Sequence, residues 1–142
     1  MMFKNILVPY DGSSHSKHAF KVALDMAKKY NSKLSMVTVL DMSPGHWAHT
    51  NLWDKAIGGT KNLVTKEFES FEDTAKKAKV PFQSKIIESH STTKAIVSYS
   101  KSKKIDLVVM GAQGISGWDK LILGSITDGV VHRVRCPVLI VR

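Results

Sequence analysis

Five short apolar runs alternate along the chain with longer segments in which apolar residues recur every three or four positions. Uninterrupted apolar runs of about 4 to 8 residues are typical of strands buried on both faces of a parallel sheet. Spacings of three and four are typical of helices with one buried face. We therefore predict strands at 3–9, 33–41 and 83–88, a fourth that ends at Met110 and is stopped by Gly111, and a fifth at 138–141.

Helices are predicted between the strands, and several have a serine in position to cap them. Ser13 or Ser14 would cap a helix that runs to Tyr30, and residues 89–92 would cap one that runs to about Lys101. A helix over 60–79 and a last helix around Gly124 complete the set. The residues predicted to line these four helices are Ala19, Ala23, Met26, Ala27, Tyr30; Val64, Phe68, Phe71, Ala75, Ala78; Ile96, Tyr99, Ser100; and Leu123, Ile126, Val130, Val131, Val134.

Residues 42–59 break this regularity. They contain Pro44 and the pair Gly58–Gly59 without a clear period, so we predict a long loop or lid there. His46 and His49 lie three positions apart in this segment, but no cluster of cysteines or carboxylates surrounds them. We interpret them as surface histidines and predict no metal site.

Five strands that alternate with four helices indicate a three-layer α/β fold with a doubly wound, five-stranded parallel sheet. Ligands of such sheets bind beyond the carboxyl ends of the strands, where the winding reverses. With the strand order 3-2-1-4-5, this reversal falls between the first and the fourth strand. Residues 9–11 would then face residues 111–114. At 142 residues, the chain is predicted to form one domain, 1–142.

Glycines mark the segment after the fourth strand. Gly111, Gly114 and Gly117 follow at intervals of three, and Gly124-Ser125-Ile126-Thr127 lies inside or at the start of the last helix. A glycine-rich loop can turn bare N–H groups toward an anion, and a helix N-terminus with hydroxyl groups adds further donors. An ordinary tight turn explains the glycine spacing equally well, and the loop lacks both standard nucleotide-binding motifs.

Asp11 is predicted at the carboxyl end of the first strand, directly before the first helix. Its carboxylate has two roles open: it can cap the turn and helix, or it can accept hydrogen bonds from an amine or hydroxyl of a ligand. His90 occupies a similar place after the third strand. The neighbouring serines, Ser89 and Ser91, are predicted to cap the next helix, and no catalytic partner is identifiable for this imidazole. We therefore interpret His90 as a turn residue and predict no catalytic residue.

Composition narrows the range of partners. No apolar run reaches the roughly 18 residues of a membrane span, and the single cysteine, Cys136, favours a reducing, cytoplasmic compartment. The formal net charge of +9 favours anionic partners. However, the lysines are scattered, and the groups at 28–29, 76–79 and 101–104 lie near predicted helix ends, where cations complement the dipole. We therefore interpret these lysines as solvated residues at helix ends, and a surface that binds nucleic acid is the less favoured interpretation.

Several stretches of the chain together match the pattern of one known family. They are VPYDGS at the end of the first strand, VTVLD in the second, DLVVMGAQG in the fourth, CPVLIVR at the fifth, and the pattern G-x2-G-x9-G-[ST] formed by Gly111, Gly114, Gly124 and Ser125. Over its whole length the chain resembles the universal stress protein family. Within that family the glycine pattern distinguishes members that bind ATP. The resemblance implies an adenine nucleotide alpha hydrolase-like fold that binds ATP, or AMP or ADP, with Mg²⁺ or Mn²⁺ shared among the phosphate oxygens.

The resemblance also implies roles for the residues at this edge of the sheet. Asp11 and Val39 would bracket the adenine. Near the base and ribose it places Pro9, Met110 and Gly111, with Tyr10 between Pro9 and Asp11. For the phosphates it implies Gly114, Gly124, Ser125, Ile126 and Thr127. Gln113 stands where the family often has His or Arg, so a charged contact with the phosphates is less expected from this position.

The family tends to dimerise through its last strand, and Val138–Val141 is an apolar edge that a twofold homodimer would cover. The function expected first is an ATP-binding module for stress response or signalling, since we identify no well-placed base, no arginine finger tied to the loop and no lysine in the phosphate cradle. A slow ATPase or a nucleotidyl-handling enzyme of the same sheet type is the alternative. A basic protein associated with nucleic acid ranks third.

Overall fold

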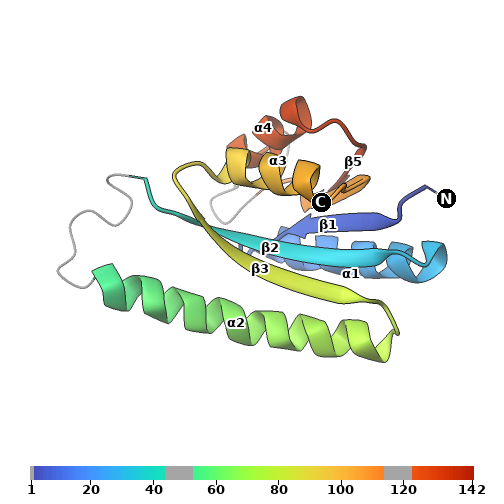
Figure 1. The fold of residues 1–142 in the computed structure, drawn as a ribbon, viewed down its shortest axis with the longest axis horizontal. Coiled ribbons are helices and arrows are strands. Elements are labelled where there is room, and N and C mark those ends of the chain that lie inside the picture. The colour runs from blue at the N-terminus through green and yellow to red at the C-terminus, as the bar shows by residue number, and fades with distance from the viewer. Residues whose placement is uncertain (1, 44–52, 114–122) are drawn as a thin grey trace.

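The computed structural model describes residues 2–43, 53–113 and 123–142. The strands are β1 (Asn5–Pro9), β2 (Lys33–Asp41), β3 (Phe82–Ser89), β4 (Leu107–Gly111) and β5 (Val138–Val141). The helices are α1 (Ser14–Tyr30), α2 (Trp53–Lys77), α3 (Thr92–Ser102) and α4 (Ser125–Arg133). All strand pairs are parallel and follow the order β3-β2-β1-β4-β5, which confirms the predicted topology (Figure 1).

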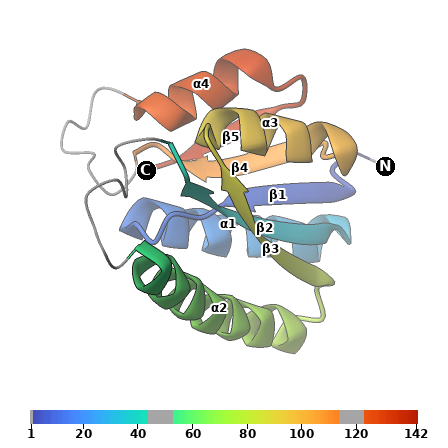
Figure 2. The same ribbon diagram turned by 60° about the vertical axis from the view of Figure 1, so that its left-hand side comes forward.

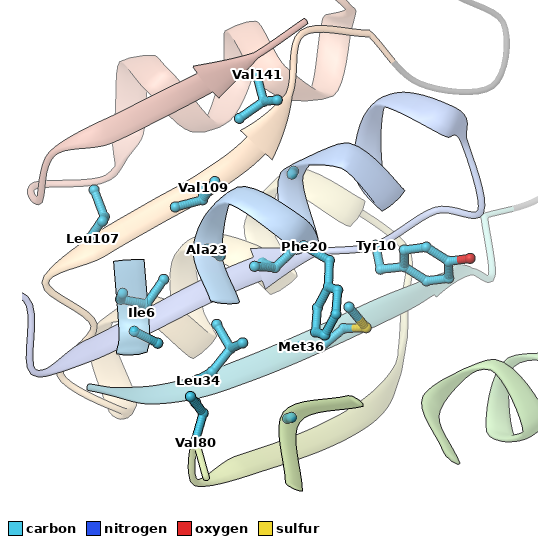
Figure 3. Packing of buried hydrophobic residues seen from close by; sticks show 14 of the residues in the cluster. Ile6, Tyr10, Phe20, Ala23, Leu34, Met36, Val80, Leu107, Val109 and Val141 are labelled. Carbon is cyan, nitrogen blue, oxygen red and sulfur yellow. The ribbon is translucent and has the colours of Figure 1, made fainter. Parts of the chain in front are cut away.

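Helices cover both faces of the sheet, with α1 and α2 on one face and α3 and α4 on the other (Figure 2). Because successive strand residues point to opposite faces, Ile6 and Val8 join the core under α1 and α2, whereas Leu7 joins the core under α3 and α4. Figure 3 shows the first core, in which Phe20 of α1 lies near Met36 of β2. Each fully buried side chain of this size stabilises the fold by about 1.5 to 3 kcal/mol.

Serine caps fix the starts of two helices, as predicted. The hydroxyl oxygen of Ser13 accepts a hydrogen bond from the backbone N–H of Ser16 at the start of α1. Ser91 accepts from the N–H of Lys94 at the start of α3 in the same way. Each bond satisfies one of the N–H groups that a helix leaves without a partner in its first turn.

The predicted loop over 42–59 is wrong in its second half, because α2 begins at Trp53. Gly58 and Gly59 lie inside this helix, where each costs about 1 kcal/mol relative to alanine. The helix tolerates them because its following turns bury Val64 and Phe68 in the first core. Residues 44–52, which include His46 and His49, lie outside the described residues. Within the part of the chain that is described, no helix is long and apolar enough to cross a membrane.

The last helix buries fewer residues than its periodicity predicts. Val130 is fully buried, but Leu123, Ile126 and Val131 are about two-fifths exposed, and Leu123 precedes the helix. Tyr30 at the end of α1 is similarly exposed. The apolar spacing overestimates the buried stripe because α4 lies at the β4–β5 end of the sheet, where, among the described residues, α3 is the helix that it packs against most closely.

Candidate functional site at the crossover of the sheet

The carboxyl ends of β1 and β4 form the point at which the sheet reverses its winding. In this pair of strands Ile6 lies opposite Leu107 and Leu7 lies opposite Val108. Beyond these residues the two strands are no longer paired with each other, although β1 continues to Pro9. A separation of this kind at the reversal is where open α/β sheets bind their ligands.

Gly111, at the end of β4, lies directly against the first turn of α1. A Cβ atom added to Gly111 would lie 2.6 Å from the Cβ of His15 and 3.1 Å from the backbone nitrogen of Ser16. The Ser16 hydroxyl in turn donates to Oδ1 of Asp11 over 3.0 Å. Gly111 and Asp11 therefore both lie against the first turn of α1, as expected for a sheet in which β1 and β4 are neighbours.

Asp11 has the first of the two roles considered from the sequence: its carboxylate caps the turn and the helix start. Its Oδ1 accepts from the Ser13 N–H over 2.9 Å and from the Ser16 hydroxyl, which fixes the turn between β1 and α1. The side chain is exposed, and no described residue donates to its Oδ2. A role toward a ligand would therefore use Oδ2, while Oδ1 holds the helix start.

Two hydrogen bonds hold the start of α4 beside the end of β4. The N–H of Gly124 donates to the carbonyl of Ala112 over 2.9 Å. The hydroxyl of Thr127, which is buried, donates to the carbonyl of Gly111 over 2.9 Å. The two ends of the glycine pattern are thus brought together. Gly114, within the pattern, lies outside the described residues.

The first turn of α4 presents backbone donors. Gly124 is its N-cap and supplies no side-chain acceptor. The N–H groups of Ser125, Ile126 and Thr127 precede the first hydrogen bond within the helix, from Asp128 to the Gly124 carbonyl, and no described residue accepts from them. Unpaired donors at the positive end of a helix dipole suit an anion such as a phosphate.

The side chain of Tyr10 points into the first core. Its hydroxyl donates to the carboxylate of Glu67 on α2, and its ring packs edge-on against Phe71 with the centroids 5.0 Å apart. Burial, followed by the hydrogen bond and the charge of Glu67, raises the pKa of Tyr10 far above its ordinary value. The hydroxyl therefore stays protonated, and contact of Tyr10 with a ligand would involve its backbone.

The other predicted site residues differ in how far they reach the surface. Met110 is buried in the second core, whereas Pro9, at the end of β1, and Val39, two residues before the end of β2, are half-buried. Gln113 is also buried. Its side chain is therefore largely withdrawn from solvent, in keeping with the absence of a charged residue at this position.

His15 is a residue at this site that the sequence analysis did not single out. Its Nδ1 is buried, and it has no hydrogen-bond partner within the described residues. His15 is followed at intervals of four residues by Ala19, Ala23 and Ala27, which lie on the buried face of α1. That spacing of four is the signal in the sequence that could have found it. A buried nitrogen without a partner destabilises the free protein until a ligand or water pairs with it.

Comparison with known proteins defines the class. The profile of the universal stress protein family matches residues 2–142. A universal stress protein of Methanocaldococcus jannaschii is 30% identical over 143 residues, which cover 99% of this chain and 83% of the relative. The chain therefore belongs to the universal stress protein family.

Solved structures share its fold. The universal stress protein UspA from Lactobacillus plantarum is 26% identical, with a TM-score of 0.81 and coverage of 100% of this chain and 99% of that one. A universal stress protein in complex with cAMP has a TM-score of 0.74 at 24% identity, with coverage of 100% and 98%. The universal stress protein from Archaeoglobus fulgidus in complex with dAMP has a TM-score of 0.71 at 17% identity, and both chains are covered in full.

Proposed function

We propose that this protein binds an adenine nucleotide, with ATP as the first candidate, where β1, β4 and α4 meet. The observation that carries the proposal is the first turn of α4, which holds three N–H donors beside the end of β4. Two structurally similar proteins of the family are in complex with cAMP and dAMP, which supports an adenine ligand.

In this proposal the phosphates lie against the backbone N–H groups of residues 125–127, with Gly114 and Gly124 leaving room for them. Ser125 is exposed and can add its hydroxyl. Thr127 contributes through its N–H, because its hydroxyl proton is donated to Gly111. A single helix start that combines backbone donors and a hydroxyl is chemically matched to phosphate oxygens.

The base and ribose would lie toward β1 and β2. Oδ2 of Asp11 can accept from the adenine amine or a ribose hydroxyl, and the half-buried Val39 offers an apolar surface to the ring. Residues 9, 110 and 111 would contribute through their backbone. Mg²⁺ or Mn²⁺ would be held by the phosphate oxygens, since no three histidine, cysteine or carboxylate side chains converge among the described residues.

Gly124→Val is expected to weaken ATP binding at least 100-fold, which is about 2.7 kcal/mol or more. A branched side chain at the N-cap would occupy the space that the proposal assigns to a phosphate. Isothermal titration calorimetry measures the affinity, and thermal unfolding checks that the variant is folded. Ile126→Ala is the matched control, because it removes an exposed side chain from the same turn and keeps every N–H group.

Unchanged ATP affinity in folded Gly124→Val would refute the phosphate position. An Ile126→Ala variant that loses as much affinity would show that the turn is merely sensitive to substitution. Equal affinity of the parent protein for ATP and GTP would refute recognition of the base by Asp11.

We further propose a homodimer through β5, which lies at one edge of the sheet. Leu139 on this strand and Val131 on α4 are exposed apolar residues, which an interface would cover. Sedimentation velocity is expected to give the mass of two chains for the parent protein and of one chain for Leu139→Lys, because lysine on an edge strand opposes pairing. A monomeric parent protein at tens of micromolar would refute this assembly.

A further inference from the structure

The edge of the sheet opposite the proposed nucleotide site carries the positive charge of the protein. At this edge, on the right in Figure 1, each helix ends and the next strand begins. Of the 21 lysine and arginine residues, 12 lie here. We call these 12 residues the basic edge. They are the lysines and arginines of 2–4, 28–33, 76–79, 101–106 and 133–137, and all are exposed.

Carboxylates do not balance this charge. The same five segments contain one carboxylate, Asp106, whereas the rest of the chain holds nine basic and eleven acidic residues. The oxygens of Asp106 face inward and accept from the backbone N–H groups of Lys4 and Asn5 over 2.8 and 3.0 Å. The whole excess of positive charge therefore belongs to the basic edge.

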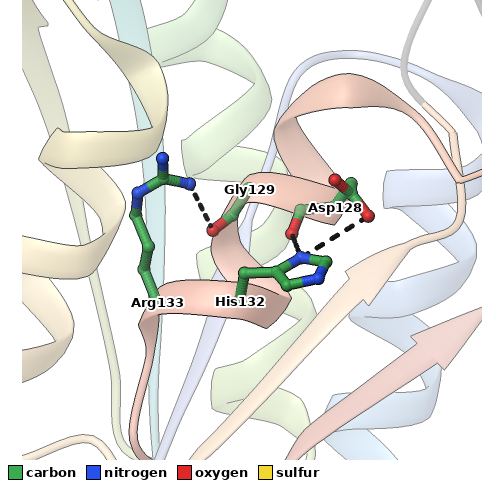
Figure 4. Close-up of polar contacts among 4 residues, drawn as sticks. All are labelled: Asp128, Gly129, His132 and Arg133. Atoms are coloured by element: carbon green, nitrogen blue, oxygen red, sulfur yellow. Dashed lines mark hydrogen bonds and ion pairs between the residues drawn. The ribbon is translucent and has the colours of Figure 1, made fainter.

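Most of these side chains are free of internal partners. Among the described residues, only Lys29 of the basic edge forms an ion pair, an exposed one with Asp25. Arg133 donates to the carbonyl of Gly129 over 3.2 Å at the end of α4, next to the turn in which His132 bonds to Asp128 (Figure 4). The remaining cations are available to an external anion.

Five members of the basic edge form a row across the sheet. Backbone hydrogen bonds hold the segments that enter the strands side by side: Leu34 to Pro81, Lys33 to Lys4, Asp106 to Asn5 and Val108 to Pro137. The basic residues carried by these segments are, in order, Lys79, Lys33, Lys4, Lys104 and Arg135. Since neighbouring strands lie about 4.8 Å apart, the row spans about 20 Å.

Two lysines of this row occupy positions that favour glycine. Lys79 and Lys104 have φ values of 59° and 53°, in the left-handed region that ends a helix. A Cβ is penalised in this conformation, whereas glycine adopts it freely. A favourable interaction with the helix dipole could explain a lysine anywhere in the last turn. It does not explain why lysine occupies the left-handed position, where glycine would end the helix better. Side chains kept in a strained conformation point to a functional role.

We infer that the basic edge binds the sugar–phosphate backbone of a nucleic acid. A row of single charges matches a linear chain of phosphates. Ten of the 12 residues are lysines, which contact phosphates as compact point charges and lack the planar guanidinium fork of arginine. Binding through such contacts is independent of sequence and falls steeply with salt.

A lipid surface fits the same edge less well. Protein surfaces that bind membranes commonly place large apolar side chains beside the cations. The exposed large apolar residues described at this edge are Met2 and Tyr30, and Tyr30 packs edge-on against Phe3 with the centroids 5.6 Å apart. The site lies at the edge opposite α4's first turn, so this inference is independent of the proposed nucleotide binding.

The test compares two variants of equal net charge. In the edge variant, Lys33, Lys79 and Lys104 are changed to glutamine. In the control variant, the exposed Lys21, Lys66 and Lys85, which lie outside the basic edge, are changed to glutamine.

Fluorescence anisotropy follows binding of a labelled 25-base-pair DNA duplex and a 25-nucleotide RNA strand from about 50 to 300 mM KCl. For the duplex, the edge variant is expected to lose at least 10-fold in affinity near 100 mM salt. Its slope of log K against log salt is expected to fall in magnitude by about 2 to 3. The control variant should retain the parent slope and affinity.

A third variant separates binding from stability. Lys79→Gly with Lys104→Gly is expected to raise the midpoint of thermal unfolding by about 2 to 4 °C, because it relieves two left-handed residues. It should still weaken binding to both probes. Full affinity in this variant, equal losses in the two glutamine variants, or binding to phosphatidylserine vesicles without binding to either oligonucleotide would each overturn the inference.

Discussion

Gly111→Ala is expected to lower the free energy of unfolding by about 3 kcal/mol. The added Cβ would lie 2.6 Å from Cβ and 2.9 Å from the carbonyl carbon of His15. The first of these atoms is the root of a side chain and the second is helix backbone, so no rotamer change relieves the overlap. The start of α1 is also held by Ser13 and by Asp11. Either α1 or β4 must therefore move.

Urea unfolding followed by circular dichroism measures this effect, with Gly58→Ala as the control. An added Cβ at Gly58 meets no atom within 4 Å. The same methyl group should therefore stabilise α2 by about 1 kcal/mol, since alanine is the better helix former. Substitutions of opposite sign at two glycines would establish close packing at Gly111. A Gly111→Ala protein as stable as the parent would disprove it.

The fold follows from the sequence because its signals are local and repeated. The apolar run at 33–41 predicts β2 to the residue, and serine caps mark the starts of α1 and α3. The alternation of strands and helices predicts a doubly wound sheet. The order 3-2-1-4-5, taken as one of the common orders of such sheets, is confirmed by the structure. The start of α2 is not predicted, because Gly58 and Gly59 lower the local helix propensity. The packing of later turns of α2 against the sheet outweighs this loss, and a local sequence pattern does not show that packing.

The finer structure of the site depends on contacts between distant parts of the chain. Gly111 belongs to a glycine pattern that points to phosphate, yet its nearest neighbour in the structure is the start of α1. Tyr10 lies in a predicted site segment, yet its side chain is held in the core by Glu67, 57 residues away. Neither contact has a sequence signal, because each depends on how the helices lie against the sheet.

The basic edge differs from these two contacts, because its residues are visible in the sequence and only their proximity is not. The lysines lie near helix ends in groups separated by 20 residues or more. In a parallel α/β fold all helices end at the same edge of the sheet, so residues scattered along the chain become neighbours. The strain at Lys79 and Lys104 becomes visible only in the backbone angles.

Thr127→Val is expected to lower the free energy of unfolding by about 2 kcal/mol, although it preserves the shape of the side chain. Thr127 is 4% exposed, and its hydroxyl supplies the proton that the Gly111 carbonyl accepts. Valine leaves that carbonyl without this donor, and an unsatisfied buried polar group costs about 1 to 3 kcal/mol. Because the volume is conserved, the loss measures the hydrogen bond and not a cavity.

In the proposed nucleotide site, the same variant should weaken ATP binding about 10-fold, because the hydroxyl holds the N–H groups of α4 in register with β4. Thr127→Ser keeps the donor and should bind ATP within about threefold of the parent, although it loses a methyl group from the core. If Thr127→Val were less stable but bound ATP normally, the hydrogen bond would serve the fold alone. If Thr127→Ser lost affinity as Thr127→Val does, the methyl contact would position the helix, and the hydroxyl would not.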